Sequence, residues 1–247
     1  MIRKNKEKDW RNGLRIGAAC LILVWAGLTP SPARADNQTT IIQGGEIGTS
    51  VDTEETAGIY IGQNAGSDSL SSPNQYNIGI GTAAGMSVVG SYNISTGYGS
   101  GRDVNGSWNT AAGTSAGQYV TGDLNTAYGA FSGRDVTGDR NTAYGVSSGQ
   151  FVTGSYNIAA GTSAGESVNG SYNTAAGRSA GQYVTGDNNI ALGTNAGSGT
   201  GSSSPLNVNN TIAIGNAARA TVDGAMAVGM NARATGTNAI AVGNGAV

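Results

Sequence analysis

Few side chains in this chain can do chemistry, and most of them are carboxylates and aromatic rings at fixed positions. Histidine is absent, and the single cysteine and every lysine lie within the first 35 residues. Asp123, Asp139 and Asp187 each follow a glycine, a placement compatible with calcium ligands. The calcium-binding solenoid repeat requires a nine-residue G-G-x-G-x-D-x-U-x pattern, which this chain lacks. We therefore interpret these aspartates as turn residues that bond to their own backbone.

Other reactive patterns are weaker. Without histidine, hydrolysis would depend on paired carboxylates, and no local pair stands out. The glycines of residues 97–101 contain G-x-G but lack the strand–helix unit that a nucleotide site needs. Arg102–Asp103 and Arg134–Asp135 stand at equivalent places, and we interpret them as solvated surface ion pairs, with a loop ligand site as the alternative. We expect no catalytic residue, no cofactor and no metal site.

An incomplete series of aromatic residues is the best candidate for ligand contact. Its members each precede a regularly repeated asparagine: Tyr76, Tyr92, Trp108, Tyr156 and Tyr172. One interpretation is that the rings shield a turn by stacking on one another. The functional interpretation is an adhesive stripe for a sugar or a protein, because exposed aromatic rings make efficient contact surfaces.

Copies of one 16-residue unit must position these residues. The repeated asparagines are Asn77, Asn93, Asn109, Asn125, Asn141, Asn157, Asn173 and Asn189. The glycines of the fifth place keep the same interval: Gly81, Gly97, Gly113, Gly129, Gly145, Gly161, Gly177 and Gly193. Counted from the asparagine, the third place is small, the eighth is Ala or Ser, and the twelfth is usually Val. Frequent glycine disfavours helix, and identical residues at identical phases are not typical of disorder.

A rung of a parallel β-solenoid is the simplest unit with these properties. Two strands of about five residues and two turns use up one period. Small residues would let two sheets approach, valine would fill the remaining width, and stacked asparagines would form amide ladders. Beyond the unit that starts at Asn189, the period shortens to 14 residues. The pattern predicts an all-β fold of about 12 rungs.

The two ends of the chain differ in composition. Residues 1–35 combine a basic stretch, an apolar run and Ala33-Arg34-Ala35, which predicts a cleaved secretory signal peptide. Residues 36–56 are polar and acidic, and we expect them to form either a cap on the first rung or a disordered N-terminal lead segment. Residues 57–247 form the predicted roll, with 16-residue units over 77–208 and 14-residue units over 211–247. Residues 36–247 carry six arginines and 13 carboxylates, a balance that disfavours nucleic-acid binding.

The 14-residue units carry a family resemblance. Residues 211–220 (TIAIGNAARA) and 225–234 (AMAVGMNARA) resemble the head repeat of YadA-like trimeric autotransporter adhesins, and residues 189–197 resemble an expanded version of it. The resemblance implies a left-handed parallel β-roll, a homotrimer, and exposure at the cell surface or outer membrane, or secretion. It also implies attachment of bacteria to host matrix or another surface receptor. The stalk and barrel anchor of that family are not recognisable here, so we expect an incomplete reading frame or a head released without its own anchor. Membrane attachment would then use an anchor not present in this chain.

Physical chemistry independently favours several copies in contact. A roll lined by Ala, Ser and Val buries little apolar area, and thin scaffolds usually need partners. Fourth-place residues such as Ile80, Tyr128, Tyr144 and Leu192 alternate with the small third place, so we expect them to point outward toward other protomers. The alternatives are an ice-binding protein, a phage-fibre module or a passive structural spacer. Ice binding would need paired threonine columns, whereas both threonine series here are incomplete. The first series is Thr110, Thr126, Thr142 and Thr174, and the second is Thr121, Thr137, Thr153 and Thr185.

Overall fold

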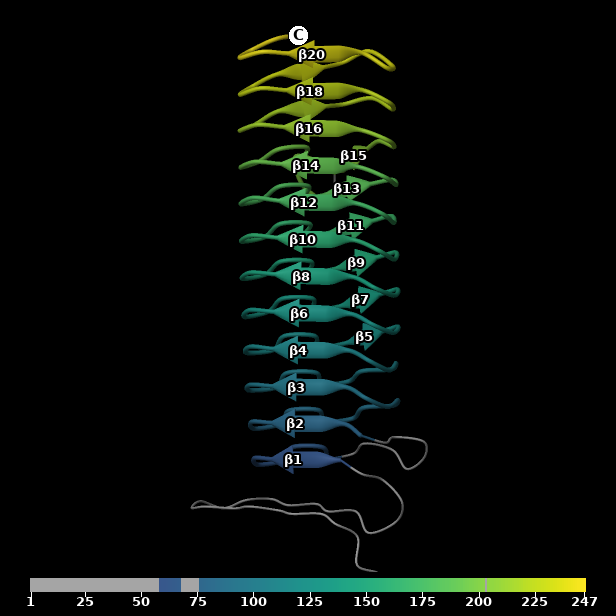
Figure 1. Ribbon diagram of the computed structural model, residues 1–247, viewed down its shortest axis with the longest axis vertical. Helices are drawn as coiled ribbons and strands as arrows, with labels where there is room; N and C mark the ends of the chain where they lie inside the picture. Colours follow the sequence, from purple (N-terminus) through teal and green to yellow (C-terminus); the bar gives the residue numbers. More distant parts are fainter. Residues whose placement is uncertain (1–57, 68–75, 203) are drawn as a thin grey trace, which may run out of the picture. The chain divides into compact units, whose positions relative to one another are not determined.

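The computed structural model describes residues 58–67, 76–202 and 204–247. Every described residue lies in one compact unit. The predicted signal peptide and the predicted cap or lead lie outside the described residues. Among those residues the structure contains strands and turns and no helix (Figure 1). The predicted all-β parallel solenoid is therefore confirmed.

One long parallel sheet contains the third-place residues. Each of its strands has three residues, and each strand pairs with its copy one period away, as in the Thr126↔Thr142 and Ala127↔Ala143 register. In spatial order, the 12 strands are β1 (Ile59–Ile61), β2 (Ile78–Ile80), β3 (Ile94–Thr96), β4 (Thr110–Ala112), β6 (Thr126–Tyr128), β8 (Thr142–Tyr144), β10 (Ile158–Ala160), β12 (Thr174–Ala176), β14 (Ile190–Leu192), β16 (Ile212–Ile214), β18 (Met226–Val228) and β20 (Ile240–Val242).

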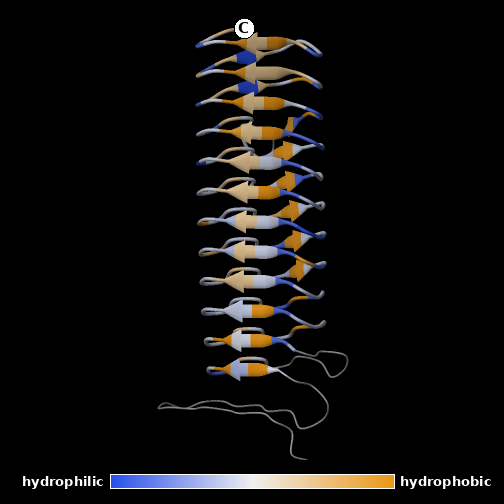
Figure 2. Ribbon diagram, in the orientation of Figure 1, coloured by the Kyte–Doolittle hydropathy of each residue, from blue (hydrophilic) through white to orange (hydrophobic). Residues whose placement is uncertain are grey.

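A second parallel sheet contains the valines of the twelfth place. Its six two-residue strands are β5 (Val120–Thr121), β7 (Val136–Thr137), β9 (Val152–Thr153), β11 (Val168–Asn169), β13 (Val184–Thr185) and β15 (Leu206–Asn207). In the 14-residue rungs, β17 (Arg219–Ala220) pairs with β19 (Arg233–Ala234). In Figure 2 the orange of hydrophobic residues marks the strands of this sheet, each of which begins with valine or leucine.

The strands are shorter than the five residues that we predicted. In one rung, Gly129 has φ 122°, Phe131 has φ 58° and Gly133 has φ 56°. These positive values leave the extended region of the backbone, so each strand ends after two or three residues. The turns instead hydrogen-bond to the turns of neighbouring rungs, for example from Phe131 N–H to Thr114 O at 2.9 Å.

The core is built from small side chains, as the repeat pattern predicts. Ala127, Ser132 and Val136 are buried, and the Ser132 hydroxyl donates to Ala143 O at 3.0 Å. The cavity between the sheets, lined by the asparagine, alanine, glycine and valine columns, has a volume of about 50 Å³. That volume holds a few water molecules and no organic ligand. Recognition of a ligand must therefore use the outside of the roll.

The repeated asparagines form a buried ladder. The Asn141 side-chain amide donates to Asn125 Oδ1 at 3.1 Å and to Gly154 O at 2.9 Å. The ladder ends at Thr211, whose hydroxyl donates to Asn189 Oδ1 at 2.7 Å. Each rung thus satisfies buried backbone groups of its neighbour, which side chains that are merely small could not do.

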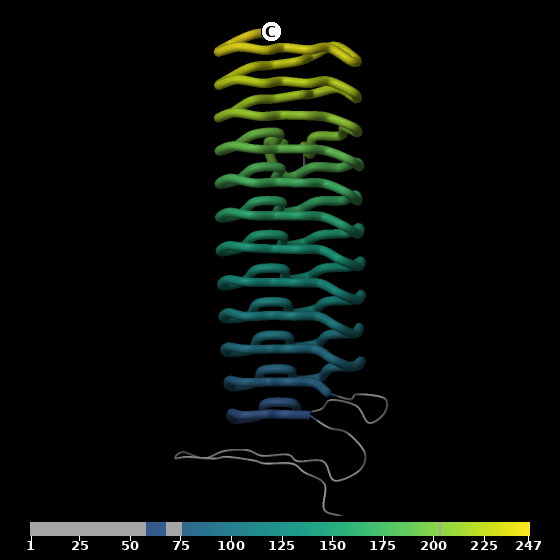
Figure 3. Tube along the Cα trace, viewed as in Figure 1, coloured from purple at the N-terminus to yellow at the C-terminus, as the bar shows by residue number. Residues whose placement is uncertain are grey.

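The change of period occurs in the long rung after β14. Val184 pairs with Val168 one period before it, but its partner in the following rung is Leu206, 22 residues on, so the extra residues lie between Val184 and Leu206. Leu206 packs against the valine cluster, and the stack continues with β16 directly on β14. In Figure 3 the trace departs from the regular coil at this rung.

Candidate functional site

The aromatic candidates lie in one column at the turn that precedes each buried asparagine. We call this column the edge column and define it as Tyr76, Tyr92, Trp108, Leu124, Arg140, Tyr156 and Tyr172. All seven residues have a positive φ, from 57° to 63°. This backbone conformation is uncommon for large side chains. It is held by hydrogen bonds to the preceding rung, such as Trp108 N–H to Ser91 O at 2.9 Å.

The aromatic rings form two stacks within the edge column. Ring centroids are 5.1 Å apart for Tyr76 and Tyr92, and 4.1 Å apart for Tyr92 and Trp108. Tyr156 and Tyr172 form the second stack, with centroids 4.9 Å apart and planes 7° apart. The distance between rungs, about 4.8 Å, brings equivalent rings face to face. The five predicted residues are thus brought together as a group of three and a group of two, with Leu124 and Arg140 between them.

Exposure separates the edge column from the core. The five aromatic residues are between 41 % and 57 % exposed. Because neighbouring rings cover one another's faces, the surface that remains consists mainly of ring edges, tyrosine hydroxyls and the indole nitrogen. These groups suit hydrogen bonds and edge contacts with a partner better than they suit broad stacking on ring faces.

Arg140 adds a positive charge to the edge column, and sequence reasoning missed it. Its guanidinium carbon lies 5.3 Å from the Tyr156 ring centroid, and its Nη1 donates to the Tyr156 hydroxyl at 2.8 Å. This geometry is a cation–π contact. Its position in the sequence could have indicated this role, because Arg140 occupies the same sixteenth place of the repeat as the tyrosines.

The glycine-following aspartates have a different role from the one predicted. Asp123 Oδ1 accepts from Ser107 N–H at 2.7 Å, and Asp187 Oδ1 accepts from Ser171 N–H at 2.7 Å. Asp139 Oδ1 likewise accepts from Asp123 N–H at 2.8 Å. Each carboxylate bonds the backbone of the preceding rung and not its own, because stacking places that N–H nearest. Among the described residues, no group of three or more His, Cys, Asp or Glu side chains is placed to hold a metal ion.

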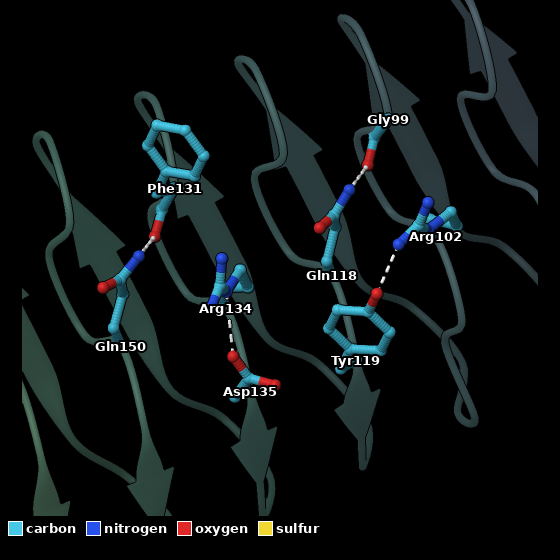
Figure 4. Close-up of polar contacts among 8 residues, drawn as sticks. All are labelled: Gly99, Arg102, Gln118, Tyr119, Phe131, Arg134, Asp135 and Gln150. Atoms are coloured by element: carbon cyan, nitrogen blue, oxygen red, sulfur yellow. Dashed lines mark hydrogen bonds and ion pairs between the residues drawn. The ribbon is translucent and has the colours of Figure 1, made fainter.

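The two arginine–aspartate pairs lie on a second surface, which includes aromatic residues that we had not predicted. The Nε–Oδ2 distances are 3.0 Å for Arg102–Asp103 and 2.9 Å for Arg134–Asp135. Each guanidinium also lies against the ring of the next rung, 5.4 Å from the Tyr119 centroid for Arg102. The pairs are therefore packed on rings and are more than solvated ion pairs. The sequence could have indicated this surface, because Arg-Asp and Gln-aromatic pairs alternate from rung to rung at the tenth and eleventh places. Figure 4 shows members of both kinds of pair.

Two further observations limit the possible functions. The first threonine series lies in the long sheet, in β4, β6, β8 and β12, whereas the second lies in β5, β7, β9 and β13 of the other sheet. The two series therefore do not form one flat paired array. The described residues include no helical segment with the length and hydropathy of a membrane span.

A comparison with protein families finds two copies of the YadA head domain repeat, at residues 209–232 and 223–246. No curated protein matches the chain. The matched copies cover the rungs of β16, β18 and β20, whose strands continue the same sheet as the 16-residue rungs. The C-terminal rungs of this chain are therefore YadA head domain repeats.

Proposed function

We propose that this chain is the head of an exported bacterial adhesin that attaches cells to host matrix or another surface without catalysis. The YadA head repeats support this class of function. The observation that carries the proposal is the set of exposed aromatic stacks on a rigid scaffold. A binding surface fixed by rung-to-rung hydrogen bonds loses little conformational entropy when a partner docks.

We assign ligand contact to the aromatic members of the edge column. Tyrosine and tryptophan provide a large amphipathic area with few rotatable bonds, and they are common among residues that dominate binding energy. Residues Tyr76, Tyr92 and Trp108 would form one contact area, and Tyr156 with Tyr172 a second. Arg140 lies against the second group and would select for partners with a hydrogen-bond acceptor.

The proposed active form is a homotrimer. The outward face of the long sheet carries exposed apolar residues, among them Ile80, Ile94, Tyr144 and Ile158. An apolar face of this length is unusual on a monomer. Contact between copies would cover it and add the buried apolar area that the small core lacks. We further propose that residues 1–35 direct export of the chain to the cell surface.

The test is an adhesion assay on wells coated with collagen, fibronectin or other matrix proteins. The variant Trp108→Ser/Tyr156→Ser/Tyr172→Ser should lose most binding and keep its far-UV circular dichroism spectrum. Tyr98→Ser is the matched control, because Tyr98 is exposed but lies outside the edge column. Undiminished adhesion by the triple variant would remove the edge column from the binding site.

Two outcomes would favour the other classes. Absence of adhesion on every surface tested would leave a passive structural spacer as the better account. Thermal hysteresis in a freezing assay would indicate ice binding. We expect no hysteresis, because the two threonine series lie in different sheets.

A further inference from the structure

Arg134 is held in one orientation by two neighbours. Its Nε donates to Asp135 Oδ2 at 2.9 Å, and its guanidinium carbon lies 5.6 Å from the centroid of the Phe151 ring. The side chain is 32 % exposed. Among the described residues, neither terminal nitrogen of Arg134 makes a hydrogen bond to the protein, so a pre-oriented pair of N–H₂ groups remains available to a ligand (Figure 4). A planar guanidinium fork of this kind matches the two oxygens of a carboxylate.

In the equivalent arginine two rungs earlier, one of the two terminal nitrogens already has a protein partner. Arg102 makes the same pair with Asp103 and lies against the ring of Tyr119. Its Nη2 also donates to the Tyr119 hydroxyl. Phe151 has no hydroxyl at that point. The Tyr119 hydroxyl thus engages a terminal nitrogen of Arg102, whereas Phe151 offers no such acceptor to Arg134.

The surroundings of Arg134 supply acceptors and apolar walls. Gln150 is only 8 % exposed, and its Nε2 donates to Phe131 O at 2.8 Å (Figure 4). This hydrogen bond fixes the amide and leaves Oε1 as the acceptor in the small part of the side chain that reaches the surface. Phe131 and Phe151 are 40 % and 46 % exposed. Sugar hydroxyls need acceptors as well as donors, and the C–H face of a sugar ring packs on exposed aromatic carbon. The patch around Arg134 offers all three kinds of contact.

The charge balance points to a single carboxylate on a neutral body. Asp135 is paired with Arg134, and Asp103 and Glu166 lie at the eleventh and tenth places of the rungs two before and two after it. Residues 36–247 are acidic as a whole. Sulfated polymers and acidic peptides would bring several negative charges and be repelled. We propose that Arg134, Gln150 and the rings of Phe131 and Phe151 bind the carboxylate and adjoining ring of an acidic sugar.

This site is separate from the edge column that carries the proposed adhesive function. Its residues occupy the seventh, tenth and eleventh places of the rung, whereas the edge column occupies the sixteenth. Loss of matrix adhesion in the edge-column variant would therefore leave acidic-sugar binding intact. Either proposal can fail without the other.

The probe is sialyllactose, titrated into the full exported chain by NMR or calorimetry, with neutral lactose as the matched ligand. We expect saturable binding of sialyllactose alone. Arg134→Gln should weaken it at least about tenfold, since charge-assisted hydrogen bonds are lost. Arg178→Gln removes a positive charge outside the patch and should leave the affinity unchanged. Circular dichroism and thermal melts confirm that each variant is folded.

Two hydroxyl-exchange variants make the test specific to geometry. Phe151→Tyr should engage Arg134 as Tyr119 engages Arg102, and so weaken binding while both charges remain. Tyr119→Phe should free Arg102 and create a second, weaker site, because Gly99 stands where the first site has Phe131. Equal binding of lactose, indifference to Arg134→Gln, or preference for heparin or an acidic peptide would each overturn the proposal.

Discussion

Asn125 Oδ1 accepts two hydrogen bonds from Asn141, one from its backbone N–H at 2.9 Å and one from its side-chain amide at 3.1 Å. The same side chain of Asn125 donates to Gly138 O at 2.9 Å. Each asparagine therefore bonds the next asparagine, one period on, and the fourteenth-place carbonyl of its own unit. A shift in the stacking register would break the contacts between successive asparagines together, so the ladder specifies the alignment of the rungs as well as their stability.

Replacement of one asparagine of the ladder should destabilise the roll. Asn141→Ala leaves the partly buried Gly154 O and the buried Asn157 N–H without their present partners. We expect a loss of about 2–4 kcal/mol in the free energy of unfolding, measured by chemical denaturation. Asn105→Ala is the control, since that side chain is exposed, and should change stability by less than about 0.5 kcal/mol. Equal effects of both substitutions would contradict a structural role for the ladder.

Much of the fold could be predicted because each residue stacks on its own copy. Ala127, Val136 and Asn141 recur at fixed intervals, so one inference about burial applies to every rung. Strand length could not be predicted in this way. Residues such as Phe131 adopt positive φ through rung-to-rung hydrogen bonds that local propensity does not include.

The contacts of the surface residues were harder to predict. Asp123 accepts from the preceding rung, and Arg134 lies against Phe151 of the following one. The first contact joins the fifteenth place of successive rungs, and the second joins the tenth place to the eleventh. Both depend on how far a side chain extends along the axis. Periodicity identifies which residues are equivalent, but it does not determine how far their side chains extend along the axis. The interruption of the aromatic series by Leu124 and Arg140, in contrast, was visible in the sequence.

A methyl group at the fourteenth place should block stacking. Gly138 has φ 133°, and a Cβ there would lie 2.1 Å from Gly154 O. We expect Gly138→Ala to cost about 3 kcal/mol or more, seen as a lower melting temperature. At Gly236 a Cβ would meet only the Ala239 Cβ, at 3.5 Å. Gly236→Ala should therefore be nearly neutral, and a similar loss at both sites would argue against the clash.

Stability should be independent of pH from about pH 6 to about pH 9. Residues 36–247 contain no His, Lys or Cys, so no side chain there has a reference pKa between those of the carboxylates and tyrosine. Proton binding then differs little between folded and unfolded chains, and the linkage slope is near zero. Thermal melts across this range measure the effect. A steady trend in melting temperature would reveal an ionisable group with a strongly altered environment.

Charges on the outward face of the long sheet should separate the protomers. Ile94 and Ile158 are 42 % and 49 % exposed in the single chain, and we expect the double variant Ile94→Asp/Ile158→Asp to sediment as a monomer. Buried like charges facing one another across a symmetric contact are costly without partners. The control Thr121→Asp/Thr153→Asp places the same charges on exposed positions of the other sheet, and it should keep the trimer mass. Sedimentation of the unmodified chain as a monomer, or trimers of the isoleucine variant, would show that copies do not meet on this face.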